Sequence, residues 1–155
     1  RPGRDRNTRL SLWTRRSFIG ITVASLRLDA VTEFDLYLIP GDSGPPLLYR
    51  ERDLVFTPEA LQRLRDNQVR ELLIPADQNG RYLRYLERNL RAILEDPAVP
   101  IDEKSEVVYC SAQGLVQSIL QDPRAHDLVS RSRGMVESTV ELLHAERNAF
   151  EELLK

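Results

Sequence analysis

The spacing of apolar residues changes its period near residue 80. Before that point, short runs with apolar and polar positions in alternation predict four strands. They cover residues 18–23, 34–39, 47–49 and 69–74. Leu26–Leu28 extends the first run, and Pro75 ends the last. The turn residues from Pro40 to Pro46 predict that the second and third strands pair as a hairpin.

A short helix interrupts this strand-rich half. Thr57 is suited to the N-cap, Pro58 to the first helical position and Glu59 to the first turn. The helix is predicted over 58–67, with Leu61 and Leu64 on its buried side.

After Gly80 the apolar positions recur every three or four residues. A helix is predicted over 81–95, with a stripe formed by Leu83, Leu86, Leu90, Ile93 and Leu94. Pro97 and Pro100 break the chain, and Asp102 is predicted to cap a second helix that runs to Gln121. The expected apolar face of the second helix consists of Val108, Ala112, Leu115, Val116 and Ile119. A short loop between two amphipathic helices favours an antiparallel pair.

The last stretch predicts a helix over 134–155, preceded by the polar stretch SRSRG at 130–134. One stripe of apolar residues follows a heptad-like spacing: Val129, Val136, Val140, Leu143, Phe150 and Leu154. Arg133 and Arg147 interrupt this stripe. Neither a Gly or Asn C-cap nor a following Pro ends the helix, so we expect a connector that continues into a further domain.

These elements predict the α+β class: a small, mostly antiparallel sheet of about four strands with one short helix, then an antiparallel helix pair and a long C-terminal helix. The expected organisation is a basic, disordered arm at 1–17, an α+β regulatory domain at 18–122 and a connector or signalling helix at 123–155.

Composition and charge narrow the class of protein. With 155 residues, of which 41% are hydrophobic, the chain can bury one core, and its net charge of −2 gives no general signal for nucleic acid. The single cysteine, Cys110, excludes an internal disulfide and favours a reducing, cytoplasmic setting. No apolar run approaches the roughly 20 residues of a membrane span. Six arginines in 1–17 would allow a contact with nucleic acid or anionic lipid, but a disordered leader is the favoured interpretation.

No set of residues predicts catalysis, a metal or a cofactor. His126–Asp127 resembles half of a metal site, but His144, the other histidine, lies 18 residues away, which is about 27 Å along a helix. Cys110 has no basic partner nearby in sequence, and the glycines do not follow a phosphate-binding spacing. We therefore predict that the chain is not an enzyme.

One basic ridge is a candidate binding surface. Arg81, Arg84, Arg88 and Arg91 are spaced to lie along one side of the first long helix. An anionic nucleotide is a possible ligand. A solvated helix face, partly neutralised by Glu87 and Glu95, is the favoured alternative.

The second half of the chain resembles the segment just upstream of the catalytic core in bacterial HD-GYP domain proteins. The matching positions are Tyr82, Tyr85, Leu86, Glu87, Leu90, Ile93, Leu94, Asp96, Pro100, Glu103, Lys104, Val108, Tyr109, Ala112, Leu115, Val116 and Ile119, followed by the run from Met135 to Lys155. The earlier segments FDLYLI, LLYR, FTPEALQRL and VRELLIPA are similar to the small N-terminal domain of those proteins, so the resemblance covers about 18–155.

This resemblance implies a regulatory part of a cyclic di-GMP phosphodiesterase, a hydrolase with a multinuclear metal centre. The catalytic His-Asp and Gly-Tyr-Pro motifs would follow Lys155, so no catalytic residue is carried over. Our main hypothesis is a dimerising sensory domain that signals through a coiled coil to the downstream catalytic domain of the same polypeptide. The alternatives are a scaffold that only dimerises and a module that binds an anionic nucleotide. The expected dimer seam is Val136, Val140, Leu143, Phe150 and Leu154.

Overall fold

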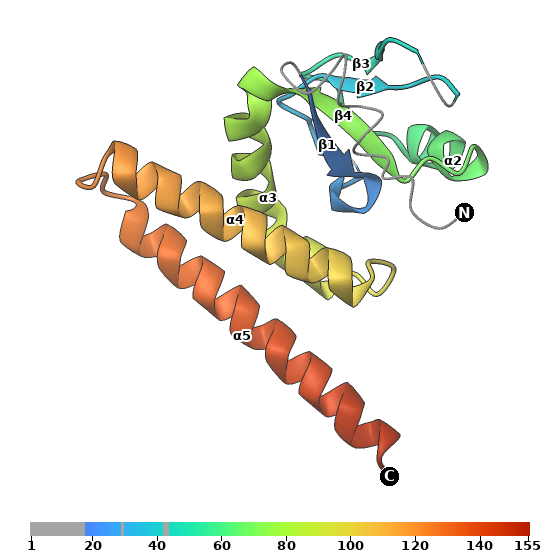
Figure 1. Ribbon diagram of the computed structural model, residues 1–155. Coiled ribbons are helices and arrows are strands. Elements are labelled where there is room, and N and C mark those ends of the chain that lie inside the picture. Colours follow the sequence, from blue (N-terminus) through green and yellow to red (C-terminus); the bar gives the residue numbers. More distant parts are fainter. Residues whose placement is uncertain (1–17, 29, 42–43) are drawn as a thin grey trace. The chain divides into compact units, whose positions relative to one another are not determined.

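The computed structural model describes residues 18–28, 30–41 and 44–155, except for the side chain of Phe150. The basic arm predicted at 1–17 therefore lies outside the described residues. The chain divides into two compact units, with the boundary between Tyr82 and Leu83. Figure 1 shows the strands before this boundary and the long helices after it. The predicted α+β class is confirmed.

The first unit contains a four-stranded antiparallel sheet with the order β1-β4-β2-β3. Its strands are β1 (Phe18–Thr22), β2 (Leu36–Leu38), β3 (Leu47–Arg50) and β4 (Glu71–Pro75). Ile19 pairs with Ile74 and Ile21 with Leu72, so these β-branched and leucine side chains share one face. The hairpin predicted between the second and third strands is confirmed as the β2–β3 pair.

The first and last strands differ from the predicted bounds for local reasons. Val23–Ser25 form a 3₁₀ turn, held by the Thr22 hydroxyl, so Leu26–Leu28 does not extend β1. Val69 donates its backbone N–H to the carbonyl of Leu64 instead of to a strand, and Gln68 has a φ of 56°. β4 consequently begins at Glu71, and Pro75 is its last residue.

The helix α2 (Pro58–Asp66) begins as the sequence predicts. The Thr57 hydroxyl accepts a hydrogen bond from the Ala60 N–H, with 3.2 Å between the two atoms, and Pro58 occupies the first turn. The buried residues of α2 are Ala60 and Leu64. Leu61, which was predicted to lie on the buried side, is half-buried.

The core of the first unit is aromatic and aliphatic. Phe34, Leu36, Phe56 and Ile74 are fully buried. Phe34 packs edge-on against Tyr82, with 5.4 Å between the ring centroids. The Tyr82 hydroxyl reaches the buried Ser25 hydroxyl at 3.0 Å, so both groups have a partner.

Hydrogen bonds between Asp35 and Gln78 join two segments of the first unit that are far apart in sequence. Gln78 donates its side-chain N–H to the Asp35 carboxylate at 2.8 Å and accepts from the Asp35 backbone N–H at 2.7 Å. The backbone N–H of Arg52 also donates to this carboxylate, at 2.7 Å. These hydrogen bonds, that from Gln78 first, hold the pKa of Asp35 below its ordinary value.

The long helices are α3 (Asn79–Glu95), α4 (Ile101–Gln121) and α5 (Leu128–Leu153). All five apolar residues of the predicted α3 stripe are buried, which confirms that prediction. The predicted cap of α4 is wrong: Pro100 holds the N-cap position without a side-chain hydrogen bond, and Asp102 lies in the first turn.

The predicted inner face of α4 is also wrong. Of its five residues only Leu115 is buried, and the other buried residues are Lys104, Val107, Ser111 and Gly114. Gly114 explains the difference, because a Cβ added there would lie 2.9 Å from the Cβ of Leu83. Small residues therefore face α3 at this crossing, and Val116 turns outward with 53% of its surface exposed.

The terminal helix begins earlier than predicted. The stretch SRSRG at 130–134 lies within the first two turns of α5 rather than in a polar linker. In Figure 1, α5 lies beside α4 near the turn that joins them, and the two helices diverge from there. The inward residues of α5 are Leu128, Met135 and Leu142, which recur every seven residues.

Candidate functional site

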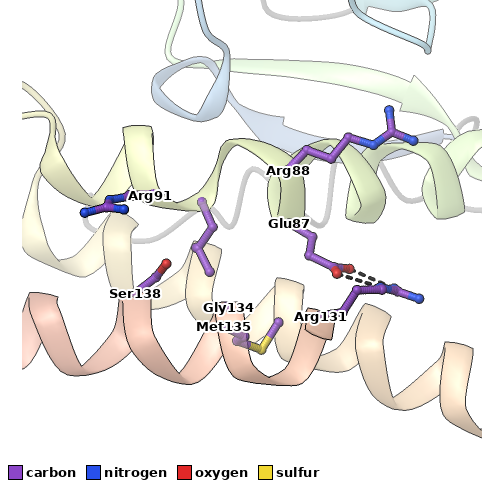
Figure 2. Close-up of a pocket in the computed structure, with 8 residues that line it drawn as sticks. Glu87, Arg88, Arg91, Arg131, Gly134, Met135 and Ser138 are labelled. Atoms are coloured by element: carbon purple, nitrogen blue, oxygen red, sulfur yellow. Dashed lines mark hydrogen bonds and ion pairs between the residues drawn. The ribbon is translucent and has the colours of Figure 1, made fainter. Parts of the chain in front are cut away.

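An ion pair fixes α5 within the second unit. Arg131 donates to both carboxylate oxygens of Glu87, from Nε at 2.6 Å and from Nη2 at 2.8 Å, and only 13% of each side chain is exposed. Figure 2 shows this two-bond contact between α3 and α5. Hydrogen bonding with Glu87 raises the pKa of Arg131 above its ordinary value. Arg131 is therefore charged at any physiological pH.

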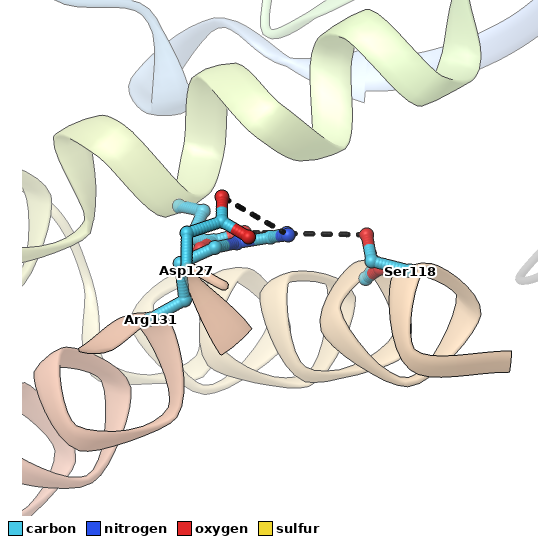
Figure 3. Close-up of polar contacts among 5 residues, drawn as sticks. Ser118, Asp127 and Arg131 are labelled. Carbon is cyan, nitrogen blue, oxygen red and sulfur yellow. Dashed lines mark hydrogen bonds and ion pairs between the residues drawn. The ribbon is translucent and has the colours of Figure 1, made fainter. Parts of the chain in front are cut away.

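The same guanidinium also contacts α4. Its Nη2 donates to the Ser118 hydroxyl at 3.1 Å, and Nη1 lies 4.0 Å from the carboxylate of Asp127 (Figure 3). One side chain thus holds α3, α4 and the start of α5 together. No local pattern in the sequence predicts this contact, because Glu87 and Arg131 are 44 residues apart and each resembles an ordinary surface charge.

The predicted dimer seam lies on the outer side of α5. Among its members, Val136 is 61% exposed, Val140 44%, Leu143 63% and Leu154 71%. Val129, in the same stripe, is 71% exposed. Phe150 belongs to α5, but its side chain lies outside the described residues, and Leu154 comes just after the helix end.

α5 therefore carries two apolar stripes that are one residue out of phase. The inner stripe packs in the second unit and consists of Leu128, Met135 and Leu142, which are at most 9% exposed. The outer stripe is the seam together with Val129, and its members other than Phe150 are exposed. Sequence reasoning found the outer stripe and missed the inner one, because periodicity cannot say which of two adjacent stripes packs inside.

The basic ridge on α3 is largely engaged with nearby groups. Arg81 donates to the Glu33 carbonyl at 3.3 Å within the first unit. Arg91 donates to Glu95 at 3.0 Å and to Glu141 at 3.4 Å. These contacts, that with Glu95 first, raise the pKa of Arg91. Arg84 is half-buried and Arg88 is exposed.

A shallow cleft of about 180 Å³ lies between α3 and α5 in the second unit. Its lining residues are Glu87, Arg88, Leu90, Arg91, Arg131, Gly134, Met135 and Ser138. In Figure 2 the Arg88 side chain extends away from α5 rather than toward it. Arg91 and Arg131 pair with carboxylates, so the lining does not form a cation-rich pocket for an anion.

The residues considered for chemistry are not brought together. Cys110 is half-buried, and burial, followed by the nearby Glu106, raises the pKa of its thiol, which disfavours the nucleophilic thiolate. His126 and His144 both lie outside the buried core, and Asp127 lies near Arg131. Among the described residues, no three His, Cys, Asp or Glu side chains are grouped to hold a metal. In the same part of the chain, no helix is long and apolar enough to cross a membrane.

Comparison with solved structures gives a structural neighbour. No family model matches the sequence, and no curated protein matches it. The solved structure of Bd1817, an HDG"Y"P protein from Bdellovibrio bacteriovorus, is similar with a TM-score of 0.45 and 22% sequence identity. The similarity covers 88% of this chain and 44% of Bd1817, so this chain spans less than half the length of that protein. At this TM-score and identity the similarity does not establish a shared function.

Proposed function

We propose that this chain is a non-catalytic regulatory domain. It pairs with a second copy of itself through α5 and transmits a signal along that helix to a downstream HD-GYP phosphodiesterase. One observation carries the pairing: α5 has an exposed apolar stripe in addition to the one that packs within its own unit. A helix on the surface of a domain needs a single apolar stripe, and a second one with heptad spacing is typical of a coiled-coil seam.

The link to an HD-GYP enzyme is supported by the sequence pattern from Tyr82 to Ile119 and by the helix that follows it. Four of the shared positions, Leu86, Leu90, Ile93 and Leu94, belong to the buried stripe of α3, and Glu87 holds Arg131. The pattern therefore includes residues that position α5 as well as residues of the core. The proposal assigns no catalytic residue to this chain.

The outer stripe has features of an interface that can adopt more than one packing. Arg133 and Arg147 lie at seam positions, and Arg147 pairs within its own helix with Glu151 at 2.9 Å. Charged residues in a seam weaken pairing and bring alternative packings closer in energy. Two packings of similar energy allow α5 to pass on a change in rotation or register.

Sedimentation over a concentration series tests the pairing. We expect a reversible dimer, and we expect Leu143→Ser to raise its dissociation constant at least tenfold, because Leu143 is 63% exposed and contributes to the seam rather than to the core. Leu28→Ser is the matched control, since Leu28 is exposed (44%) in the first unit. A chain that stays monomeric at all concentrations would contradict the proposal.

Transmission is tested in a longer protein that carries an HD-GYP domain after this chain. Insertion of one alanine after Ser138 rotates everything downstream by about 100°. We expect phosphodiesterase activity to change severalfold, whereas insertion of seven residues, which restores the seam to within about 20°, leaves it closer to the parent. Equal activity in all three proteins would exclude signalling through helix rotation.

A further inference from the structure

α4 carries an exposed apolar stripe of its own that the α5 seam does not include. Tyr109 is 64% exposed, Val116 53% and Leu120 77%, and Ile119 beside them is 37% exposed. Their spacing of seven and four residues places Tyr109, Val116 and Leu120 on one side of the helix. Three large apolar side chains in a row, each more than half exposed, are unusual on a helix that packs only within its own domain.

The hairpin formed by α4 and α5 brings this stripe level with the outer stripe of α5. The Arg131–Ser118 hydrogen bond sets the register of the two helices, which run antiparallel from the turn at 122–127. With equal rise along both helices, Leu120 is level with Val129, and Tyr109 with Val140.

Both stripes point away from α3. On α4, Gly114 faces Leu83 of α3, and Tyr109 is five residues before it, about 140° around the helix. On α5, Arg131 faces Glu87 of α3, and Val136 is five residues after it, again about 140° around. Since α4 and α5 contact each other near the turn that joins them, the two stripes border the same face of the hairpin there.

We propose that two copies of the chain associate through this whole face, so that two α4–α5 hairpins form a four-helix bundle. This inference rests on the proposed function and specifies the interface: α4 contributes as much as α5. A two-helix coiled coil of α5 alone would leave Tyr109, Val116 and Leu120 in water, whereas a bundle covers them.

The size of the face fits a second copy. Full burial of an aliphatic side chain removes about 60–120 Å² from water, so the eight exposed residues would bury on the order of 400–500 Å² of apolar area per copy. These are the four on α4 and Val129, Val136, Val140 and Leu143 on α5. A stable interface buries about 800 Å² per partner, of which somewhat more than half is apolar.

The α4 part of the face suits contact with itself, whereas the α5 part carries Arg133 at a seam position. A two-fold axis brings the same residues together from both copies, so charges on the face would meet like charges. The middle of the α4 stripe is bordered by Ala112 and by Gln113, whose amide donates to the Tyr109 hydroxyl at 3.1 Å. These residues carry no charge, and two copies meet there without electrostatic repulsion.

The test compares serine substitutions on the two helices by sedimentation. Val116→Ser and Leu120→Ser alter only α4, Leu143→Ser alters only α5, and Gln117→Ser is the control at an exposed polar position of α4. We expect each of the three apolar variants to raise the dimer dissociation constant at least tenfold and Gln117→Ser to leave it within about twofold. Thermal unfolding checks that all four variants remain folded, as expected for exposed positions.

The outcomes separate this inference from the proposed function. Weakening by the α4 variants to the same degree as by Leu143→Ser supports the bundle. If Leu143→Ser dissociates the dimer and the α4 variants do not, pairing through α5 stands and the bundle is wrong. If the unaltered chain is monomeric, both are wrong, and the face then belongs to a different partner.

Discussion

At the scale of single residues, the Glu87–Arg131 pair does more than an ordinary surface ion pair. Its two hydrogen bonds are made by side chains that are only 13% exposed, and the guanidinium also reaches Ser118. A charge in such a place is costly without its partner, because water cannot replace the lost contact. The exposed pair Arg91–Glu95, at 68% and 61% exposure, provides a natural comparison.

We expect Glu87→Gln to lower the free energy of unfolding by about 2–4 kcal/mol, since Arg131 would keep its charge and lose its main acceptor. Glu95→Gln is expected to leave it nearly unchanged, because solvent screens that pair. Urea titration measures both. Similar losses in the two variants would show that Glu87 and Arg131 act only as surface charges.

Asp35 is expected to make the stability of the fold depend on pH in the acidic range. Its hydrogen bonds with Gln78 and Arg52 hold its pKa in the folded chain below the unfolded value of about 3.9. The carboxylate therefore stabilises the fold above about pH 4, and this contribution is lost as the pH falls through the folded pKa. Unfolding midpoints of the unaltered chain and Asp35→Asn should differ by a constant amount between about pH 5 and 7 and converge below about pH 4. A difference that persists in acid would refute this role.

At the scale of elements, the sequence predicts a helix better than it predicts which side of the helix is buried. The stripe of α3 was predicted in full because its five residues are large and apolar and lie on one side. The buried face of α4 was missed because Ser111 and Gly114, which lie at its centre, carry no hydrophobic signal. The start of α5 was missed because Arg131, within a polar stretch, is held by a residue 44 positions earlier. Long-range polar contacts of this kind leave no local pattern.

Two glycines in long helices should respond to alanine in opposite directions. A Cβ at Gly114 would lie 2.9 Å from the Cβ of Leu83, whereas one at Gly134 meets nothing within 4 Å. Gly134→Ala should therefore stabilise the chain by about 0.5–1 kcal/mol through helix propensity. At Gly114 the same gain is outweighed by overpacking, which typically costs about 1–3 kcal/mol. Thermal unfolding of the two variants decides the matter, and stabilisation by both would mean that α4 does not approach α3 as closely as the structure shows.

At the scale of the whole molecule, the candidate seam could be predicted from the sequence, whereas the face that includes α4 could not. Val136, Val140 and Leu143 stand out by their spacing alone. Val116 was assigned to the core, and Tyr109 and Leu120 were left out, because only the packing of the second unit reveals that they are exposed. The strands of the first unit were largely predictable, since alternation and turn residues agree there.

Dimerisation is expected to make the thermal stability of the chain depend on protein concentration. A dimer that forms only from folded chains makes the thermal midpoint rise with protein concentration. Leu143→Ala is expected to abolish this rise with little loss of stability at low concentration. Leu142→Ala, one residue earlier and 9% exposed, should retain the rise and lower the free energy of unfolding by about 2–4 kcal/mol. If Leu142→Ala instead abolishes the rise and Leu143→Ala lowers the free energy of unfolding, α5 packs with its other side inward.

The two stripes of α5 raise the question of what makes this helix pack in a single rotation. Leu128, Met135 and Leu142 are each followed by an apolar residue, Val129, Val136 or Leu143, so hydrophobicity alone would accept a second placement rotated by about 100°. In that placement Ser132 would take the position of Arg131, and Glu87 would lose its cation. The ion pair between Glu87 and Arg131 therefore selects one of the two rotations of α5. We expect a double variant, Glu87→Met with Arg131→Met, to keep most of its stability but to give two sets of NMR signals for α5, and a single set would show that packing alone selects the rotation.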